Sequence, residues 1–218
     1  MNGLTRVRAT LTGRSVDRRP VLPILHSGLP PLLEVPLGTF YTDAEVMADV
    51  IVRGYRTFGY DGVQLSLGVT GEAEALGADV AQPPDGASVL NEPLLQDFPS
   101  PESAETLEDL RTRDPLTGGR MPLYYEAVWR TAGQIGEEAF VLAMLRGPLL
   151  AASQLCGAED LLIAMITAPD EVETLLAFTT GVARELGTWL RSSGAHGLIL
   201  GEATCSPNFI SPTLYRTL

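Results

Sequence analysis

The sequence predicts an α/β fold in which parallel strands alternate with helices, and three observations support this fold class. Four short apolar stretches are spaced along the chain, with helix-like segments between them. The third stretch, Ala139–Leu145, is apolar throughout, which is typical of a strand covered on both faces. Of the 218 residues, 45% are hydrophobic and 19% are charged, which suits a folded domain with a sizeable core. Alternation of this kind favours a parallel sheet with right-handed crossovers.

The first half of the chain is expected to hold two strands and one well-marked helix. Pro20–Leu25 is predicted to be a short buried strand with a proline at its start. The pattern at Thr42–Glu45 predicts a capping box, in which the Thr42 hydroxyl and the Glu45 carboxylate each cap the other's backbone N–H. The helix that follows is expected to end at Gly59. Gly62–Leu67 is the second predicted strand.

The second half begins with a connection rich in Pro, Asp and Ser that extends to about Arg120 and is expected to be mostly irregular. Apolar spacing and turn residues then define the remaining elements. They are a short helix at Ala104–Arg111, a helix from Pro122 to Ile135, the strand Ala139–Leu145, helices at Glu159–Ile166 and Asp170–Arg191, and the strand Leu198–Leu200.

The number of predicted strands indicates part of a barrel. Four β/α units make half of a TIM-type (β/α)8 barrel, which takes about 250 residues when complete. Here 218 residues contain only four predicted strands. We therefore expect residues 1–218 to be one domain that holds about the first four units of such a barrel. The open sheet edges predict self-association or a complementary chain as a partner.

Composition excludes several classes of partner. The net charge of −12 argues against nucleic acid and against anionic membrane surfaces. The uncharged runs are too short to cross a bilayer, and the first twenty residues carry arginines but no apolar core of a secretory signal. Two cysteines make no disulfide framework, so a reducing, cytoplasmic location is expected.

Polar side chains follow each predicted strand at its carboxyl end, where parallel α/β sheets bind their ligands. In strand order they are His26 and Ser27; Thr70, Glu72 and Glu74; Arg146; and Glu202, Thr204, Cys205, Ser206 and Asn208. Because these strand ends share one edge of the sheet, we expect the side chains to converge on a single pocket.

Each of these residues also has a structural interpretation, and the sequence leaves both readings open. Glu72 and Glu74 suit the first turn of a helix, where carboxylates face the positive end of the helix dipole. Arg146 suits a surface ion pair, His26 a hydrogen-bonded core position, and Cys205 a small buried apolar position.

The histidines and cysteines are not arranged as a metal site. His196 precedes the predicted strand Leu198–Leu200 and Cys205 follows it, so an extended chain places them roughly 25–30 Å apart. Cys156 lies in a helical stretch, where a structural role is expected. No His-x-Cys motif and no second cysteine occur at the carboxyl ends of the strands. We therefore expect no bound metal in this chain.

Several segments, found in order from about Arg19, together resemble the uroporphyrinogen decarboxylase superfamily. They are "RRPVLPILHSG", "FGYDGVQLSLGVTGEAEALGADV", "GGRMPLYYEAV", "LRGPLLAASQLCGAEDLLIAMITAPDEVETLL" and "GAHGLILGEATCSPNFISPTLY". Within the superfamily they look closest to the corrinoid (methylcobamide:coenzyme M-type) methyltransferase branch. The resemblance implies a (β/α)8 barrel with a tetrapyrrole bound at the carboxyl ends of the strands, and a chain truncated just after the fourth strand.

Two departures from the family pattern bear on the activity. The decarboxylases carry an arginine-rich loop after the first strand, whereas "LHSGLPPLLE" has no arginine. They also carry an aspartate at the second strand end, which is absent near Gly68. The resemblance therefore favours methyl transfer between a corrinoid (cobalamin) and a small thiol-type acceptor. The zinc ligands of that branch, a His-x-Cys after the fifth strand and a later cysteine, would lie beyond Leu218.

Under this reading Glu72 and Glu202 are expected to be catalytic, while His26, Arg146, Ser206 and Asn208 are expected to bind substrate. The expected partner is a corrinoid protein or a free corrinoid. Two alternatives stay open. One is a uroporphyrinogen decarboxylase of porphyrin metabolism, and the other is a non-catalytic half-barrel, either a truncated gene product or a subunit completed by a second chain.

Overall fold

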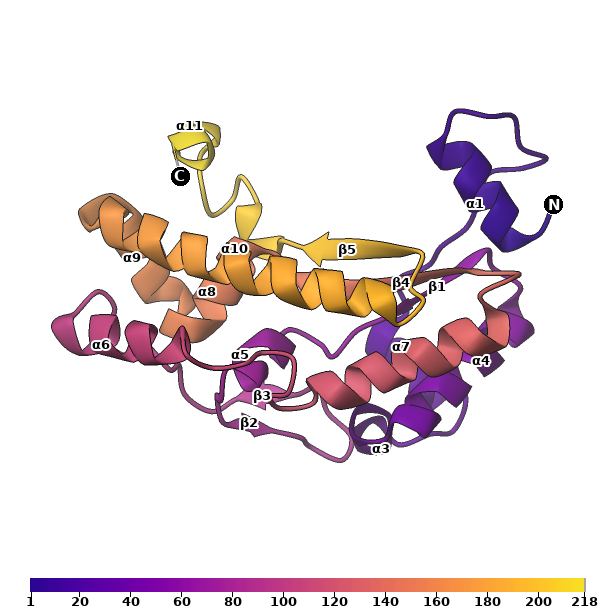
Figure 1. The fold of residues 1–218 in the computed structure, drawn as a ribbon, viewed down its shortest axis with the longest axis horizontal. Helices are drawn as coiled ribbons and strands as arrows, with labels where there is room; N and C mark the ends of the chain where they lie inside the picture. The colour runs from indigo at the N-terminus through magenta and orange to yellow at the C-terminus, as the bar shows by residue number, and fades with distance from the viewer. Residues whose placement is uncertain (218) are drawn as a thin grey trace.

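The computed structural model describes residues 1–217, with His26 described by its backbone alone, and its centre is a three-stranded parallel sheet (Figure 1). The strands are β1 (Gly62–Leu65), β4 (Phe140–Arg146) and β5 (Gly197–Gly201), in the order β1-β4-β5. Both neighbouring pairs are parallel. The predicted α/β class with a parallel sheet is therefore confirmed.

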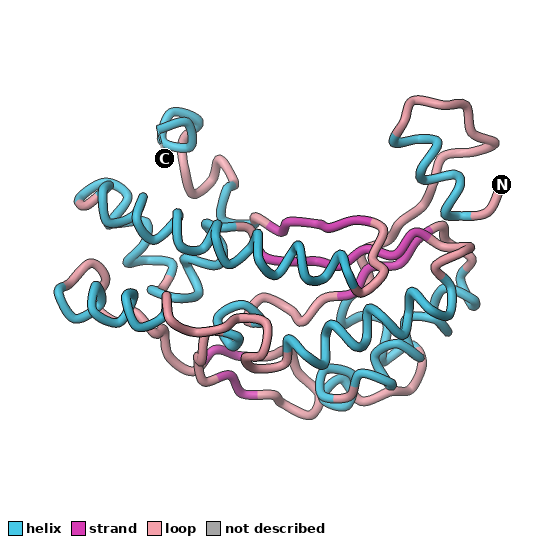
Figure 2. The backbone as a smooth tube through the Cα atoms, in the orientation of Figure 1, coloured by secondary structure: helices cyan, strands magenta, loops and turns pink. Residues whose placement is uncertain are grey.

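Helices occupy most of the described chain, and the longest of them lie on one side of the sheet (Figure 2). The helices are α1 (Gly3–Leu11), η1 (His26–Gly28), α2 (Leu29–Leu32), α3 (Leu37–Thr42), α4 (Ala44–Phe58), α5 (Gly71–Ala75), α6 (Pro101–Leu110), α7 (Met121–Ile135), α8 (Pro148–Cys156), α9 (Ala158–Thr167), α10 (Pro169–Ser192), η2 (Ala203–Cys205) and α11 (Pro212–Thr217).

The two faces of the sheet have different cover. Val63, Leu65 and Leu145 point into the main core, against α4, α7 and α10. The alternate side chains Phe140 and Leu142 point the other way, where α1 packs on the amino ends of the strands. This alternation leaves the carboxyl half of the second face for polar side chains.

The predicted strand Pro20–Leu25 is wrong. Its residues form no regular strand, although Val21 lies beside the start of β1 and exchanges two hydrogen bonds with Asp61. Pro20 and Pro23 supply no N–H, so the segment cannot continue a ladder along β1.

Three further expectations are corrected. The N-cap of α4 is Asp43, which accepts hydrogen bonds from the N–H groups of Glu45 and Val46, while the Thr42 hydroxyl donates to Gly38. A carboxylate at this position also meets the positive end of the helix dipole. The long connection holds an antiparallel pair, β2 (Val80–Ala81) and β3 (Val89–Leu90), in addition to α6. Helices α1, α2, α3, α8 and α11 were not predicted.

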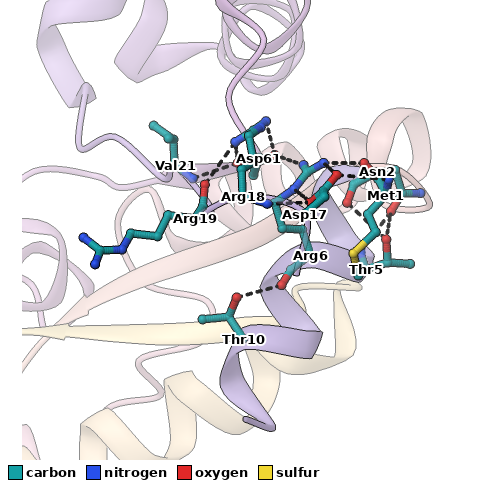
Figure 3. Close-up of polar contacts among 10 residues, drawn as sticks. All are labelled: Met1, Asn2, Thr5, Arg6, Thr10, Asp17, Arg18, Arg19, Val21 and Asp61. Atoms are coloured by element: carbon teal, nitrogen blue, oxygen red, sulfur yellow. Dashed lines mark hydrogen bonds and ion pairs between the residues drawn. The ribbon is translucent and has the colours of Figure 1, made fainter. Parts of the chain in front are cut away.

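An ion network fastens the amino-terminal segment to the sheet (Figure 3). Asp61 is only 2% exposed and accepts hydrogen bonds from both Arg6 and Arg18, and from the Val21 N–H at 2.7 Å. Arg6 also binds Asp17, with 2.6 Å between Nε and Oδ1. Burial would raise the pKa of Asp61, but the hydrogen bonds from Arg18, Val21 and Arg6 outweigh it and lower that pKa.

Strand β1 ends two residues earlier than predicted because other groups take its place beside β4. The Met144 N–H donates to the Tyr124 hydroxyl at 2.8 Å, and that hydroxyl donates to the Leu65 carbonyl at 2.7 Å. One step further, the Arg146 N–H donates to a Glu72 carboxylate oxygen at 2.7 Å. The two side chains thus supply the hydrogen-bond partners of β4 beyond the end of its pairing with β1.

Replacing Tyr124 by Phe is expected to lower the free energy of unfolding by about 2 kcal/mol, because the buried Met144 N–H loses its acceptor. Urea unfolding measures this change. The neighbouring Tyr125 is a matched control, since its hydroxyl meets only exposed Ser192. Tyr125→Phe is expected to change stability by less than about 0.5 kcal/mol. Equal effects of the two substitutions would contradict the bridging role.

No single helix in the described part of the chain is both long and apolar enough to cross a membrane. Helices α8 and α9 satisfy the length and composition test only as a pair, and they are bent by 107° relative to one another.

Candidate functional site

Arg146 is the central charged group at the carboxyl edge of the sheet. It is the last residue of β4 and only 7% exposed. Its Nη2 donates to the Ser66 hydroxyl at 2.7 Å and lies 2.9 Å from the Met144 sulfur. Gly201 is its neighbour on β5, where a Cβ would come within 2.9 Å of Nη1. The glycine therefore leaves space for the guanidinium group.

The guanidinium group of Arg146 forms no salt bridge with a described carboxylate, and the nearby Glu72 carboxylate binds its backbone N–H instead. Its Nε is buried without a hydrogen-bond partner among the described residues. Gln64 of β1 lies on the same face of the sheet as Arg146, and its side-chain nitrogen is also buried without a partner among the described residues. Burying an unpaired cation is costly unless an anion or other polar partner is supplied. This edge of the sheet therefore has the chemistry to receive an anionic group.

Glu72 lies in α5 and is 5% exposed. Burial raises the pKa of its carboxyl group, while the hydrogen bond from the Arg146 N–H and the charge of Arg146 act in the opposite direction. The carboxylate thus fixes the backbone at the end of β4, beside the buried guanidinium. Glu74 faces elsewhere and pairs with Arg120 at 2.7 Å, so its predicted place at this edge is not borne out by the geometry.

Glu202 follows β5 and binds the amino end of α8. Its two carboxylate oxygens accept hydrogen bonds from the N–H groups of Leu149 at 2.9 Å and Leu150 at 3.0 Å. A carboxylate at this position satisfies free N–H groups and complements the helix dipole. The Glu202 side chain also lies directly against Gly147, the residue after Arg146. Glu72 and Glu202 therefore hold the same turn from two sides.

The two cysteine thiols carry their protons at neutral pH. Burial, with Glu202 nearby, raises the pKa of Cys205 to about 11, and its sulfur lies 3.6 Å from the carboxylate. Burial and Asp160 raise the pKa of Cys156 to about 12. Neither thiol is poised as a thiolate nucleophile.

The remaining predicted residues lie further out. Asn208 is exposed and Ser206 is half-buried, and both belong to the segment between η2 and α11. The His26 side chain lies outside the described part of the chain. A pocket of about 360 Å³ adjoins Glu202 and is otherwise mainly apolar; its walls include Leu149, Leu200, Cys205, Ile210 and Tyr215.

Sequence reasoning missed Gln64, Ser66 and Tyr124. The signal for the first two was present, because polar Gln64 and Ser66 alternate with the apolar Val63 and Leu65 in the predicted strand. Tyr124 gave no such signal, since its hydroxyl acts across a contact between distant segments.

The described residues do not fit a zinc site. No three His, Cys, Asp or Glu side chains among them lie close enough to hold a metal ion. His196 precedes β5 and Cys205 follows it, as the sequence indicates. The prediction that this chain binds no zinc remains to be tested by elemental analysis.

Comparison with known proteins assigns the family. The family model described as uroporphyrinogen decarboxylase (URO-D) matches residues 3–218. The chain belongs to the uroporphyrinogen decarboxylase family. The chain is similar to the methylcobamide:CoM methyltransferase MtaA of Methanosarcina barkeri, with 24% identity over 215 residues. It is also similar to MtbA of Methanosarcina mazei, with 26% identity over 222 residues.

This chain spans only part of the length of these relatives. The alignment with MtaA covers 97% of this chain and 62% of the relative, and that with MtbA covers 97% and 61%. A solved methyltransferase from Methanosarcina mazei superposes with a TM-score of 0.88 at 22% identity, over 100% of this chain and 64% of that one. The superposition establishes a shared fold for the described elements.

Proposed function

We propose that this chain takes part in methyl transfer between a corrinoid and a small thiol acceptor that carries an anionic group. The names of the similar proteins support the reaction class, since MtaA and MtbA are both methylcobamide:CoM methyltransferases. The single observation that carries the choice of acceptor is the buried Arg146 guanidinium without a described carboxylate partner.

In the proposed reaction the thiol sulfur of the acceptor is the nucleophile. A bound corrinoid would supply the methyl group and keep the electron pair of its bond to that group, the acceptor sulfur would form the new bond to carbon, and the thiol proton would leave to solvent. The described residues hold no thiolate and no zinc-binding set that could assist this step. The contribution of this chain is therefore to bind and orient the acceptor.

Glu72 and Glu202 are proposed to set the position of Arg146. Glu72 fixes the Arg146 N–H, and Glu202 anchors α8 immediately after Gly147. The catalytic roles predicted for both carboxylates stay predictions, and a direct role of Glu72 in proton transfer would use its raised pKa. Ser206 and Asn208 remain candidates for contacts at the rim of the pocket.

Decarboxylation of uroporphyrinogen is a weaker proposal. A substrate rich in carboxylates needs several cations, and the segment "LHSGLPPLLE" provides no arginine. Arg120, a further arginine near Tyr41, is already paired with Glu74. Unpaired carboxylates buried beside a chain of net charge −12 would be strongly disfavoured.

Cobalamin is therefore expected to bind this chain more tightly than uroporphyrinogen. Equilibrium dialysis of each ligand against the purified chain, followed by absorbance, measures the two dissociation constants. A result in which uroporphyrinogen binds tightly and cobalamin does not would reverse the ranking and favour the decarboxylase alternative.

A further inference from the structure

A second groove lies at the opposite end of the sheet from Arg146. It has a volume of about 670 Å³ and runs between α1 with the turn after it and the amino ends of β4 and β5. Phe140, the first residue of β4, and His196, the residue before β5, form one wall. Arg8 and Arg14 are on the other side.

The groove is cationic within an acidic protein. The first twenty residues contain five arginines and one aspartate, although the whole chain has a net charge of −12. The polar part of its lining consists of Arg8, Arg14, His196 and hydroxyl groups, the rest is apolar, and no acidic side chain is among its lining residues. Such a concentration of positive charge attracts anions despite the net charge of the protein.

The ion network in Figure 3 explains which arginines stay available. Arg6 and Arg18 are bound to Asp61, and Arg6 is also bound to Asp17. Arg8 lies on another face of α1, and neither its side chain nor that of Arg14 forms an ion pair or hydrogen bond with a described residue. The network therefore fixes α1 while leaving two guanidinium groups for a ligand.

His196 adds a donor to this groove. Its Nδ1 accepts a hydrogen bond from the Val141 N–H at 3.0 Å, so the neutral ring carries its proton on Nε2. The ring packs on Phe140 with 5.4 Å between ring centroids, which fixes its orientation. Burial lowers the pKa of His196, and the nearby charges of Arg8 and Arg191 lower it further. An anion bound between Arg8 and the His196 ring would favour the charged form of that ring.

We propose that this groove binds a small molecule through a doubly charged oxyanion, above all a phosphoryl group, held by Arg8, Arg14 and the Nε2–H of His196. Guanidinium groups are suited to bidentate contacts with such oxyanions. The volume lies within the range of small-molecule sites. The site is separate from the strand-end pocket and goes beyond the proposed methyl transfer.

The test is a titration of the whole chain with inorganic phosphate, followed by NMR of the His196 ring and the backbone amides. We expect phosphate to shift signals of residues 5–15 and to raise the pKa of His196. The double variant Arg8→Gln and Arg14→Gln should weaken phosphate binding about tenfold or more. Arg53→Gln with Arg56→Gln, two exposed positions of α4, is the control with the same change in charge and should bind as the wild type does.

The proposal would be overturned by equal weakening in both double variants, by the absence of any shift with phosphate, or by binding of citrate without binding of phosphate. Arg14→Gln alone, in the turn beyond α1, gives a second variant if the double variant does not fold. A folded single variant with unchanged phosphate affinity would also count against the proposal.

Discussion

Replacing Asp61 by Asn is expected to lower the free energy of unfolding by about 3 kcal/mol. Asp61 is 2% exposed and joins Arg6, Arg18 and the backbone of Val21, so its loss leaves Arg6 buried without this charge. Removing one partner of a buried ion pair typically costs 3–5 kcal/mol, and the half exposure of Arg18 favours the lower end. Urea unfolding at pH 7 measures the change.

The acid dependence of stability gives an independent readout of the same network. Because the pKa of Asp61 is lowered by folding, its contribution is complete above its unfolded pKa of about 3.9 and is lost as the pH falls through the folded value. The Asn variant should lose this part of the acid dependence. Asp49→Asn, which removes an exposed pair with Arg53, is the control and should change stability by less than about 1 kcal/mol. Equal losses in the two variants would contradict the network's role.

The second large effect expected is association of the chain in dilute solution. In the described residues β5 has a strand on one side only, and Leu198 and Leu200 are 36% and 57% exposed. These leucines adjoin a groove beside α10 that contains Ala183 and Gly187. An open parallel edge next to apolar side chains recruits a further chain, so light scattering should find dimers or larger species.

A single substitution tests whether this edge is responsible. Leu200→Glu should shift the population toward monomer, because it replaces an exposed apolar side chain of the open edge by a charged one. Val89→Glu in β3, also at an exposed apolar position, is the matched control and should leave the association unchanged. A monodisperse wild-type monomer with a sharp, cooperative melt would contradict the open-edge reading and weaken the functional inference drawn from the longer relatives.

The sheet could be predicted where burial dictates the sequence. Ala139–Leu145 is apolar at every position because helices pack against both faces of this strand, and the structure places β4 there. Pro20–Leu25 has a similar apolar content, but a backbone ladder depends on N–H groups that Pro20 and Pro23 do not have. Composition alone did not separate these two cases.

The candidate site could be predicted only where its residues directly follow a strand. The strand-end rule located Arg146 and Glu72, and the structure joins them through the Arg146 N–H. The role of Glu202 as a helix cap could not be anticipated because α8 was not predicted, although Pro148 after Gly147 is a typical helix start. Tyr124 acts between β1 and β4, a relation that exists only in three dimensions.

Buried Arg146 is proposed to receive the anionic group of a thiol acceptor. Calorimetric titration with 3-mercaptopropionate and with the neutral 2-mercaptoethanol tests it most directly, in the wild type and in Arg146→Gln, with Arg53→Gln as the exposed control. The wild type and the control should prefer the anionic thiol by about tenfold, and Arg146→Gln should lose that preference. Equal affinity for the two thiols in the wild type, or a preference that survives in Arg146→Gln, would contradict the assignment.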